Sequence, residues 1–339
     1  MNNEITQLLD VITPEIFNQY MNQFTMEKSA FVQSGVAVAD ERVSRNITSG
    51  GLLVNMPFWN DLSGEDEVLG DGEKALSTGK ITAASDIAAV LYRGRGWSVN
   101  ELAAVISGDD PMKALMSKLG SYWLRREQQV LLSVLGGVFA PATGSGDTAT
   151  PAGQLLETHL NDQKAKPIDE FMILDTKQLL GDAAEQLSMI IVHSAIYTSL
   201  QKLNLIEFVR PSEEGKAIPY YQGYRVVVDD GVPTTGNTPA TKVYTSFLFS
   251  AGAIGRNAGN PSQLTTFEKD RDAAKGNDRV FTRRALTMHP YGIKWTDAER
   301  EEGNITPTNK DLANPANWKK VYEDKALGIV ALNSKAILG

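Results

Sequence analysis

The sequence predicts a mixed α+β protein in which an extended hairpin precedes one long helix and a strand-rich second half follows. Three observations lead to this prediction. Residues 50–97 are acidic and rich in glycine, residues 111–138 carry apolar side chains at helical spacing, and short apolar runs bounded by turn residues recur after residue 187. An enzyme of this size rarely carries a long arm ahead of one spine-like helix, so the arrangement favours a subunit that reaches its neighbours.

Composition narrows the class of protein. The 339 residues are 42% hydrophobic, which suits one large folded domain or two modest ones. The net charge of −8 disfavours a dedicated nucleic-acid binder but permits a wall that encloses nucleic acid. The absence of cysteine excludes disulfides, zinc–thiolate sites, iron–sulfur clusters and thiol nucleophiles. The N-terminus lacks the pattern of a secretory signal, and the most apolar run, residues 130–140, falls short of the about 20 residues of a membrane helix.

The N-terminal 97 residues divide into two segments. Residues 3–24 have apolar side chains at helical spacing, and Thr13-Pro14 predicts that a second short helix begins there. This segment either folds onto its own core or forms an arm that docks on another copy of the chain. Residues 34–97 contain strand-like runs on both sides of an acidic stretch, 61–73, and predict a long two-stranded hairpin that needs a neighbour to lie on.

The long helix is predicted over residues 111–138. Pro111 suits the first turn, Asp109 or Asp110 can cap it, and the helix would extend about 40 Å at 1.5 Å per residue. One face is apolar and indicates core packing rather than a cofactor site; it carries Met112, Leu115, Met116, Leu119, Tyr122, Trp123, Val130, Val134 and Val138.

The second half alternates before strands dominate it. Residues 171–187 and 194–203 are predicted to be helical, with a short buried strand at 189–192 between them. Strands follow at 206–210, 224–229 and 244–249, and the turn sequence 275–278 joins two longer strands at 264–270 and 279–288. The tail, 317–332, is predicted to start as a helix and to end in an apolar strand.

No group of residues predicts catalysis. His193 ends an apolar run and is interpreted as structural, because adjacent Ser194 is the sole partner the sequence suggests; His289 precedes turn residues, and His159 has no informative context. The acidic stretch 61–73 lacks the oxygen spacing of a calcium loop and is interpreted as a solvated face. Nucleotide-binding and nucleophile-elbow motifs are absent, so we assign no catalytic, cofactor-binding or metal site and no cofactor. The charged pairs Arg271-Asp272 and Arg283-Arg284 are expected at strand edges or subunit contacts.

A series of short motifs spans nearly the whole chain in a specific order. They are Thr13-Pro14-Glu15-Ile16-Phe17, Met56-Pro57-Phe58-Trp59, Trp97-Ser98, Ser107-Gly108-Asp109-Asp110-Pro111, Tyr122-Trp123, Leu135-Gly136-Gly137-Val138-Phe139, His193-Ser194, Gly223-Tyr224-Arg225-Val226-Val227-Val228-Asp229-Asp230, Arg271-Asp272-Ala273-Ala274, His289-Pro290-Tyr291-Gly292-Ile293-Lys294-Trp295 and Asn317-Trp318. In this order the chain resembles the major capsid proteins of tailed double-stranded DNA bacteriophages, which have the Hong Kong 97-type fold.

The resemblance implies a division of the chain. Residues 1–51 would be an N-terminal arm and residues 52–96 an extended loop. A peripheral domain would comprise 97–170 and 263–309, with the spine helix 111–138, and an axial domain would comprise 171–262 and 310–339. Copies would form pentamers and hexamers that close an icosahedral shell around the genome. The −8 charge suits a wall along which packed DNA can slide.

The resemblance also implies partners. A separate scaffolding protein is expected because the chain begins almost at the arm, unless the chain is an already processed form. A portal and, optionally, a decoration protein are further partners in a virion assembled in the host cytoplasm. No membrane contact is expected. Lys74 and Lys80 lie where some relatives carry a crosslinking lysine, but no partner motif is matched, so no crosslink is predicted. Two alternatives stay open: an encapsulin-type compartment with the same fold, and an α/β enzyme that uses residues 171–262.

Overall fold

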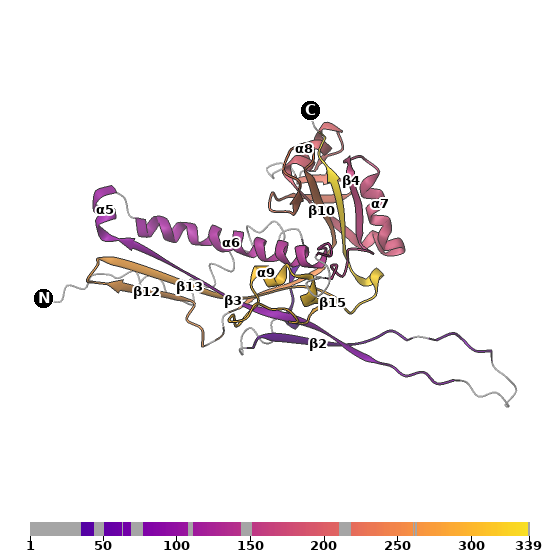
Figure 1. Ribbon diagram of the computed structural model, residues 1–339, viewed down its shortest axis with the longest axis horizontal. Helices are drawn as coiled ribbons and strands as arrows, with labels where there is room; N and C mark the ends of the chain where they lie inside the picture. Colours follow the sequence, from indigo (N-terminus) through magenta and orange to yellow (C-terminus); the bar gives the residue numbers. More distant parts are fainter. Residues whose placement is uncertain are drawn as a thin grey trace.

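The computed structural model of the chain has two large β-sheets joined by one long helix (Figure 1). It describes residues 35–43, 51–62, 64–68, 77–107, 111–143, 151–209, 218–259, 261 and 263–337. The helices expected within residues 3–24 and the capping residues Asp109 and Asp110 lie outside these ranges.

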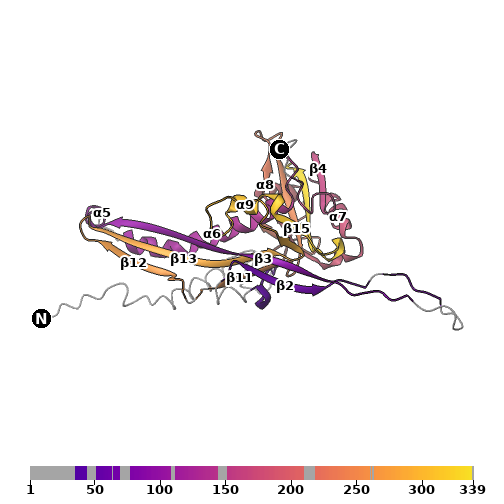
Figure 2. The same cartoon turned by 60° about the horizontal axis from the view of Figure 1, so that its bottom comes forward.

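The first sheet is six-stranded and carries the hairpin. Its order is β1 (Ala37–Ala39), β11 (Ile254–Gly259), β13 (Asn277–Pro290), β3 (Ala83–Asn100) and β2 (Leu53–Trp59), and β12 (Phe267–Asp272) also pairs with β13. β1 and β11 run parallel, and the other pairs are antiparallel. Figure 2 shows this sheet as a long thin layer that continues into the hairpin.

β3 links the hairpin to the body in one continuous strand. Its first part pairs with β2, from Ala83 opposite Trp59 to Ala89 opposite Leu53. Its second part, from Val90 to Asn100, pairs with β13. The sequence predicted the two-stranded hairpin correctly but treated this strand as shorter runs that end near Trp97.

The second sheet is eight-stranded. Its order is β4 (Leu160–Pro167), β16 (Ile329–Lys335), β10 (Val243–Ser250), β5 (Leu187–Val192), β8 (Tyr224–Val228), β7 (Ile218–Tyr221) and β6 (Glu207–Val209), and β9 (Thr234–Thr235) pairs with β10. The β4/β16 and β5/β8 pairs are parallel. A further two-stranded sheet pairs β14 (Ile293–Trp295) with β15 (Trp318–Lys320).

Among the helices, α6 (Pro111–Val138) has the bounds that the sequence predicted. The others are α5 (Glu101–Ser107), α7 (Met172–Lys177), α8 (Ser194–Lys202) and α9 (Asn309–Leu312), with 3₁₀ turns η1 (Glu41–Val43), η3 (Gln178–Gln186), η4 (Pro315–Asn317) and η5 (Asp324–Ala326). The helix predicted at 171–187 is therefore two pieces. Inside η3, Gly181 adopts a φ of 57°, a left-handed conformation that interrupts the helical path.

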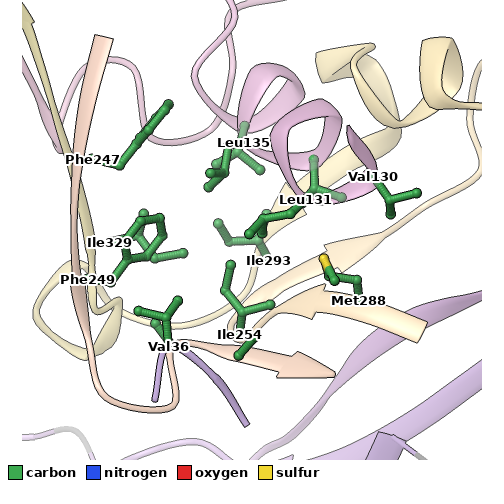
Figure 3. Close-up of a cluster of buried hydrophobic side chains, with 14 of the residues drawn as sticks. Val36, Val130, Leu131, Leu135, Phe247, Phe249, Ile254, Met288, Ile293 and Ile329 are labelled. Carbon is green, nitrogen blue, oxygen red and sulfur yellow. The ribbon is translucent and has the colours of Figure 1, made fainter. Parts of the chain in front are cut away.

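The C-terminal end of α6 lies in the main core, between the two sheets (Figure 3). Leu131 and Leu135 of α6 contribute to the same cluster as Phe247, Phe249 and Ile254. Alternate residues of the eight-stranded sheet point the other way, where Leu248 and its neighbours pack in a cluster that contains residues of α7 and α8. Both faces of this sheet are therefore buried, which explains why its central strands are continuous apolar runs in the sequence.

The tail departs from the prediction at its start. Trp318 begins strand β15 rather than a helix, because its ring is buried, packs edge-on against Trp295 with ring centroids 5.1 Å apart, and donates from Nε1 to the carbonyl of Leu312 at 2.8 Å. The apolar strand expected after it is β16. The sequence analysis did not anticipate β4, β7, β11 and β14.

Candidate assembly surfaces

The hairpin exposes large apolar side chains to solvent. It extends the six-stranded sheet away from the eight-stranded sheet (Figure 1), and Trp59, Leu62, Val68 and Ile81 are 67%, 78%, 86% and 53% exposed. A two-stranded hairpin has little stability of its own in water, and exposed apolar groups gathered on one projection are typical of an interaction site. The hairpin therefore has the properties of a surface that another protein covers.

A buried acid–histidine pair fixes the base of the hairpin. Asp86 of β3 and His289 of β13 are both 1% exposed, and Asp86 Oδ1 lies 2.8 Å from His289 Nε2. The other oxygen of Asp86 accepts the backbone N–H of Gly292 at 2.8 Å, in the turn before β14. Phe58 of β2 adds an edge-on contact with Tyr322, with ring centroids 4.7 Å apart. These contacts set the direction in which the hairpin leaves the body.

The segment after β1 is tied to the same turn by a second polar group. The Tyr291 hydroxyl donates to Asp40 Oδ2 at 2.6 Å, and Arg42 Nη2 lies 2.7 Å from the same oxygen. The hydrogen bond from Arg42 is the largest cause that lowers the pKa of Asp40, from 3.8 to about 2, with Tyr291 adding to it against the effect of burial. Burial, with a smaller contribution from Asp40, raises the pKa of Tyr291.

A cavity of about 470 Å³ lies between β3, α6 and β13. Its aromatic wall consists of Trp97, Tyr122 and Trp123, whose neighbouring ring centroids are 5.0 and 5.4 Å apart. Among the described residues, four arginines also line it, namely Arg93, Arg95, Arg126 and Arg284, and Glu127 is the one acidic residue in the lining. The cavity is thus positively charged in a chain whose net charge is negative.

Glu127, which lines this cavity, forms a buried ion pair with Arg256. Their side chains are 6% and 4% exposed, and Arg256 donates from both Nε and Nη2 to the carboxylate. Burial lowers the pKa of Arg284 beside them; nearby Glu127 opposes that effect and Arg256 adds to it. This pair connects α6 to β11. Each buried charge is tolerated because its partner and their hydrogen bonds are in place.

The end of the molecule opposite the hairpin carries α5 and the β12–β13 turn (Figure 1). Leu102, Val105 and Ile106 of α5 are largely exposed. Arg271 bridges Glu101 of α5 and Asp278 of β13, and along the β12–β13 pair Arg279 pairs with Asp272 at 2.9 Å and Arg283 with Glu268 at 3.0 Å. Of the charges expected at strand edges or subunit contacts, Arg271, Asp272 and Arg283 form ion pairs within the chain, whereas Arg284 lines the cavity. The apolar face of α5 is a second exposed surface.

The structure separates the three histidines. His193 caps α8 by accepting the backbone N–H of Ala195 at 3.1 Å, and its Nδ1 lies 3.5 Å from Asp230. The sequence analysis missed this acidic neighbour, which also accepts the backbone N–H of Ser194. Burial lowers the pKa of His193 and of His159, whose side chain is fully buried beside Asp324. Neither residue adjoins the cavity.

No group of three or more histidine, cysteine or acidic side chains within the described ranges could hold a metal ion. No helix in that part of the chain has both the length and the apolar character that crossing a bilayer requires. Asp61, Glu65 and Asp66 of the acidic stretch are exposed, Glu67 is partly exposed, and residues 69–76, including Lys74, lie outside the described ranges.

Sequence signals existed for the buried acids. Asp86 shares its strand face with Ala84, Ala88 and Val90. Glu127 follows Trp123 by four residues and precedes Val130 by three, which places it on the apolar face of the helix. Glu127 was not among the residues that the sequence analysis assigned to the apolar face of the helix. An acid on an apolar face predicts a buried partner, but the sequence does not identify that partner.

Comparisons with known proteins agree with this architecture. No protein-family model matches the chain. A major capsid protein of Bacillus phage SPP1 is 38% identical over 327 residues, which are 96% of this chain and 97% of the relative. The capsid of Ralstonia phage GP4 has a similar structure, with a TM-score of 0.59 at 10% identity over 92% of each chain. The mature capsid of bacteriophage PhiM1 matches with a TM-score of 0.52 at 10% identity, over 92% of this chain and 88% of that one.

The structural matches share the mixed α+β fold, and the sequence relative identifies the family. The resemblance to phage capsid proteins is confirmed. The sequence relative is a phage capsid protein, and therefore favours neither the encapsulin alternative nor the enzyme alternative. Capsid proteins are structural and assemble into multimeric shells, so self-association and a location in the virion capsid follow. Because it is 38% identical to a phage major capsid protein over 96% of its length, the chain belongs to the family of phage major capsid proteins.

Proposed function

We propose that copies of this chain form pentamers and hexamers that close an icosahedral shell around the double-stranded DNA of a tailed phage. The observation that carries the proposal is the projecting hairpin, whose apolar side chains are exposed while its base is held by buried polar contacts. A projection of this kind gains stability when a neighbouring copy covers it, because burying apolar surface is favourable. If the hairpin of each copy contacts the next copy around a ring, this one kind of contact links all subunits of the ring.

The proposed division into an N-terminal arm (1–51), an extended loop (52–96), a peripheral domain and an axial domain follows the resemblance, with two adjustments. β4 pairs with β16 in the eight-stranded sheet, so we group residues 160–167 with the axial domain. β11 pairs with β13 in the six-stranded sheet, so we group residues 254–259 with the peripheral domain. The spine helix α6 then connects the two domains through the main core.

The partners of the shell are also proposed. The net charge of −8 suits a wall that encloses DNA without sequence-specific binding, since a negatively charged protein repels the phosphates of DNA. We further propose a scaffolding protein, a portal and optionally a decoration protein, with assembly in the host cytoplasm and no membrane contact. These partners rest on the family alone.

A hairpin truncation tests the proposed function. Residues 61–81 are replaced by a short glycine-containing turn between Asn60 and Thr82, because the backbone bond between these two residues, at 2.9 Å, ends the paired part of the hairpin. Removing the whole of 56–97 would instead delete residues of β3 that pair with β13. We expect the truncated chain to keep the melting temperature of the full chain but to form no shells when both are expressed with the other head proteins. Equal shell formation by the two chains would contradict the proposal.

A further inference from the structure

The cavity between β3 and α6 has guanidinium groups available for a further partner. Arg95 and Arg126 are exposed. The side chain of Arg95 has no acceptor among the described residues. Arg126 donates to the neutral amide oxygen of Gln129 at 2.6 Å and lies over the ring of Tyr122, 5.2 Å from its centroid. No carboxylate among the described residues neutralises either guanidinium, although both border a cavity with aromatic walls.

The hairpin carries a segment with the complementary chemistry. Glu65 and Asp66 are exposed and have no partner among the described residues, whereas Glu67 accepts hydrogen bonds from Ser77 within the hairpin. Leu62 and Val68, on either side of the two acids, are largely exposed. The segment therefore presents two carboxylates flanked by apolar side chains, and the cavity presents arginines beside aromatic rings. Carboxylates and guanidinium groups form strong charge-assisted hydrogen bonds.

The segment cannot enter the cavity of its own chain. β3 runs straight from Ala83, at the hairpin end of its pairing with β2, to Arg95 in the body, a distance of about 40 Å at ~3.3 Å per residue. Segment 64–68 follows the end of β2 at Trp59, which pairs with Ala83 at the far end of the strand pair from the body (Figure 1). Any contact between the two sites must therefore join different copies of the chain.

We propose that the cavity receives hairpin segment 64–68 of a second copy, with Glu65 and Asp66 of one copy meeting Arg95 and Arg126 of the other. The inference rests on the proposed function and adds the partner surface that the hairpin occupies. The cavity would then serve subunit recognition. The charge pairs would determine which part of the hairpin lies against β3, and the apolar side chains of the hairpin would cover the aromatic wall.

Crosslinking between two populations of the chain tests the contact directly. The chain has no cysteine, so one population carries Asp66→Cys and the other Arg95→Cys. Both are assembled together and treated with a short bismaleimide whose reach matches a salt-bridged side-chain pair. We expect a covalent dimer in assembled shells and none between unassembled chains. Exposed Glu157→Cys replaces Asp66→Cys in the matched control and should give no dimer. Shells without the expected dimer would overturn the inference.

Charge exchange provides a second test. Glu65→Arg with Asp66→Arg, or Arg95→Glu with Arg126→Glu, places like charges together and should lower the yield of shells at least about tenfold. All four substitutions in one chain restore complementarity and should restore the yield. If the unsubstituted chain forms no shells, the proposed function fails. If it forms shells and the exchanged pairs do so equally, this inference alone fails. Loss of DNA retention by Arg95→Glu with Arg126→Glu, without loss of shells, would assign the cavity to nucleic acid instead.

Discussion

Two adjacent glycines near the end of α6 allow a matched test of how this helix joins the sheets. Gly137 is buried, and a Cβ built on it would meet the carbonyl oxygen of Leu312 and lie 2.9 Å from Trp318 Nε1. Gly136 is only partly buried, and a Cβ there would have nothing within 4 Å. We predict opposite effects for Gly137→Ala and Gly136→Ala on the free energy of unfolding.

The magnitudes follow from helix propensity and from the contacts at each position. Alanine is favoured over glycine inside a helix by about 1 kcal/mol, so Gly136→Ala should raise the free energy of unfolding by up to about that amount. At Gly137 the same gain is opposed by overpacking, about 1–3 kcal/mol, and by displacement of the Trp318 hydrogen bond to Leu312, about 1 kcal/mol. The net expectation for Gly137→Ala is a loss of about 1–3 kcal/mol.

The assay is urea unfolding of unassembled chains, followed by the fluorescence of the tryptophans, with thermal melting as a second measurement. At ~2.1 cal/mol/K of unfolding entropy per residue, 1 kcal/mol corresponds to about 1–2 °C in melting temperature for a chain of 339 residues. Equal behaviour of the two variants, or a more stable Gly137→Ala, would refute the close contact of α6 with α9 and β15.

The remaining predictions concern polar groups near the base of the hairpin. Asp86→Ala leaves the ring of buried His289 unpaired and should lower the free energy of unfolding by about 2–4 kcal/mol in urea titrations, whereas exposed Asp66→Ala should leave it unchanged. Because the folded-state pKa of Asp40, about 2, lies below its ordinary 3.8, its bonds stabilise the fold above about pH 4 and are lost as the pH falls from 4 toward 2. Urea midpoints at pH 5 and pH 2.5 should therefore differ less for Asp40→Asn than for the unsubstituted chain; an equal difference would contradict the proposed role of the Arg42 contact.

Local patterns made the hairpin and α6 predictable. The helical spacing of apolar residues and Pro111 determine α6 from a single segment, and the residues of the β12–β13 turn lie next to one another in the sequence. The β12–β13 hairpin needs a left-handed residue at its turn, and Gly276 supplies it with a φ of 60°.

Long-range pairing explains what the sequence analysis missed. β4 becomes a strand because Leu160 lies opposite Ala331, a partner far along the chain, while its own residues, 160–167, are mostly polar. Trp318 was expected in a helix, but its pairing with Trp295 in β14 decided its conformation. For the assembly surfaces, the acidic hairpin was visible in the sequence. The arginine-lined cavity was not, because it combines β3, α6 and β13.

A three-dimensional reconstruction of assembled shells by electron microscopy tests the central claim most directly, because it shows where each hairpin lies. We expect residues 59–82 of every copy to cross onto an adjacent copy, with Asp66 beside Arg95 at the cavity between β3 and α6. A shell in which each hairpin folds back on its own chain, or extends into solvent without contacting another copy, would contradict the account.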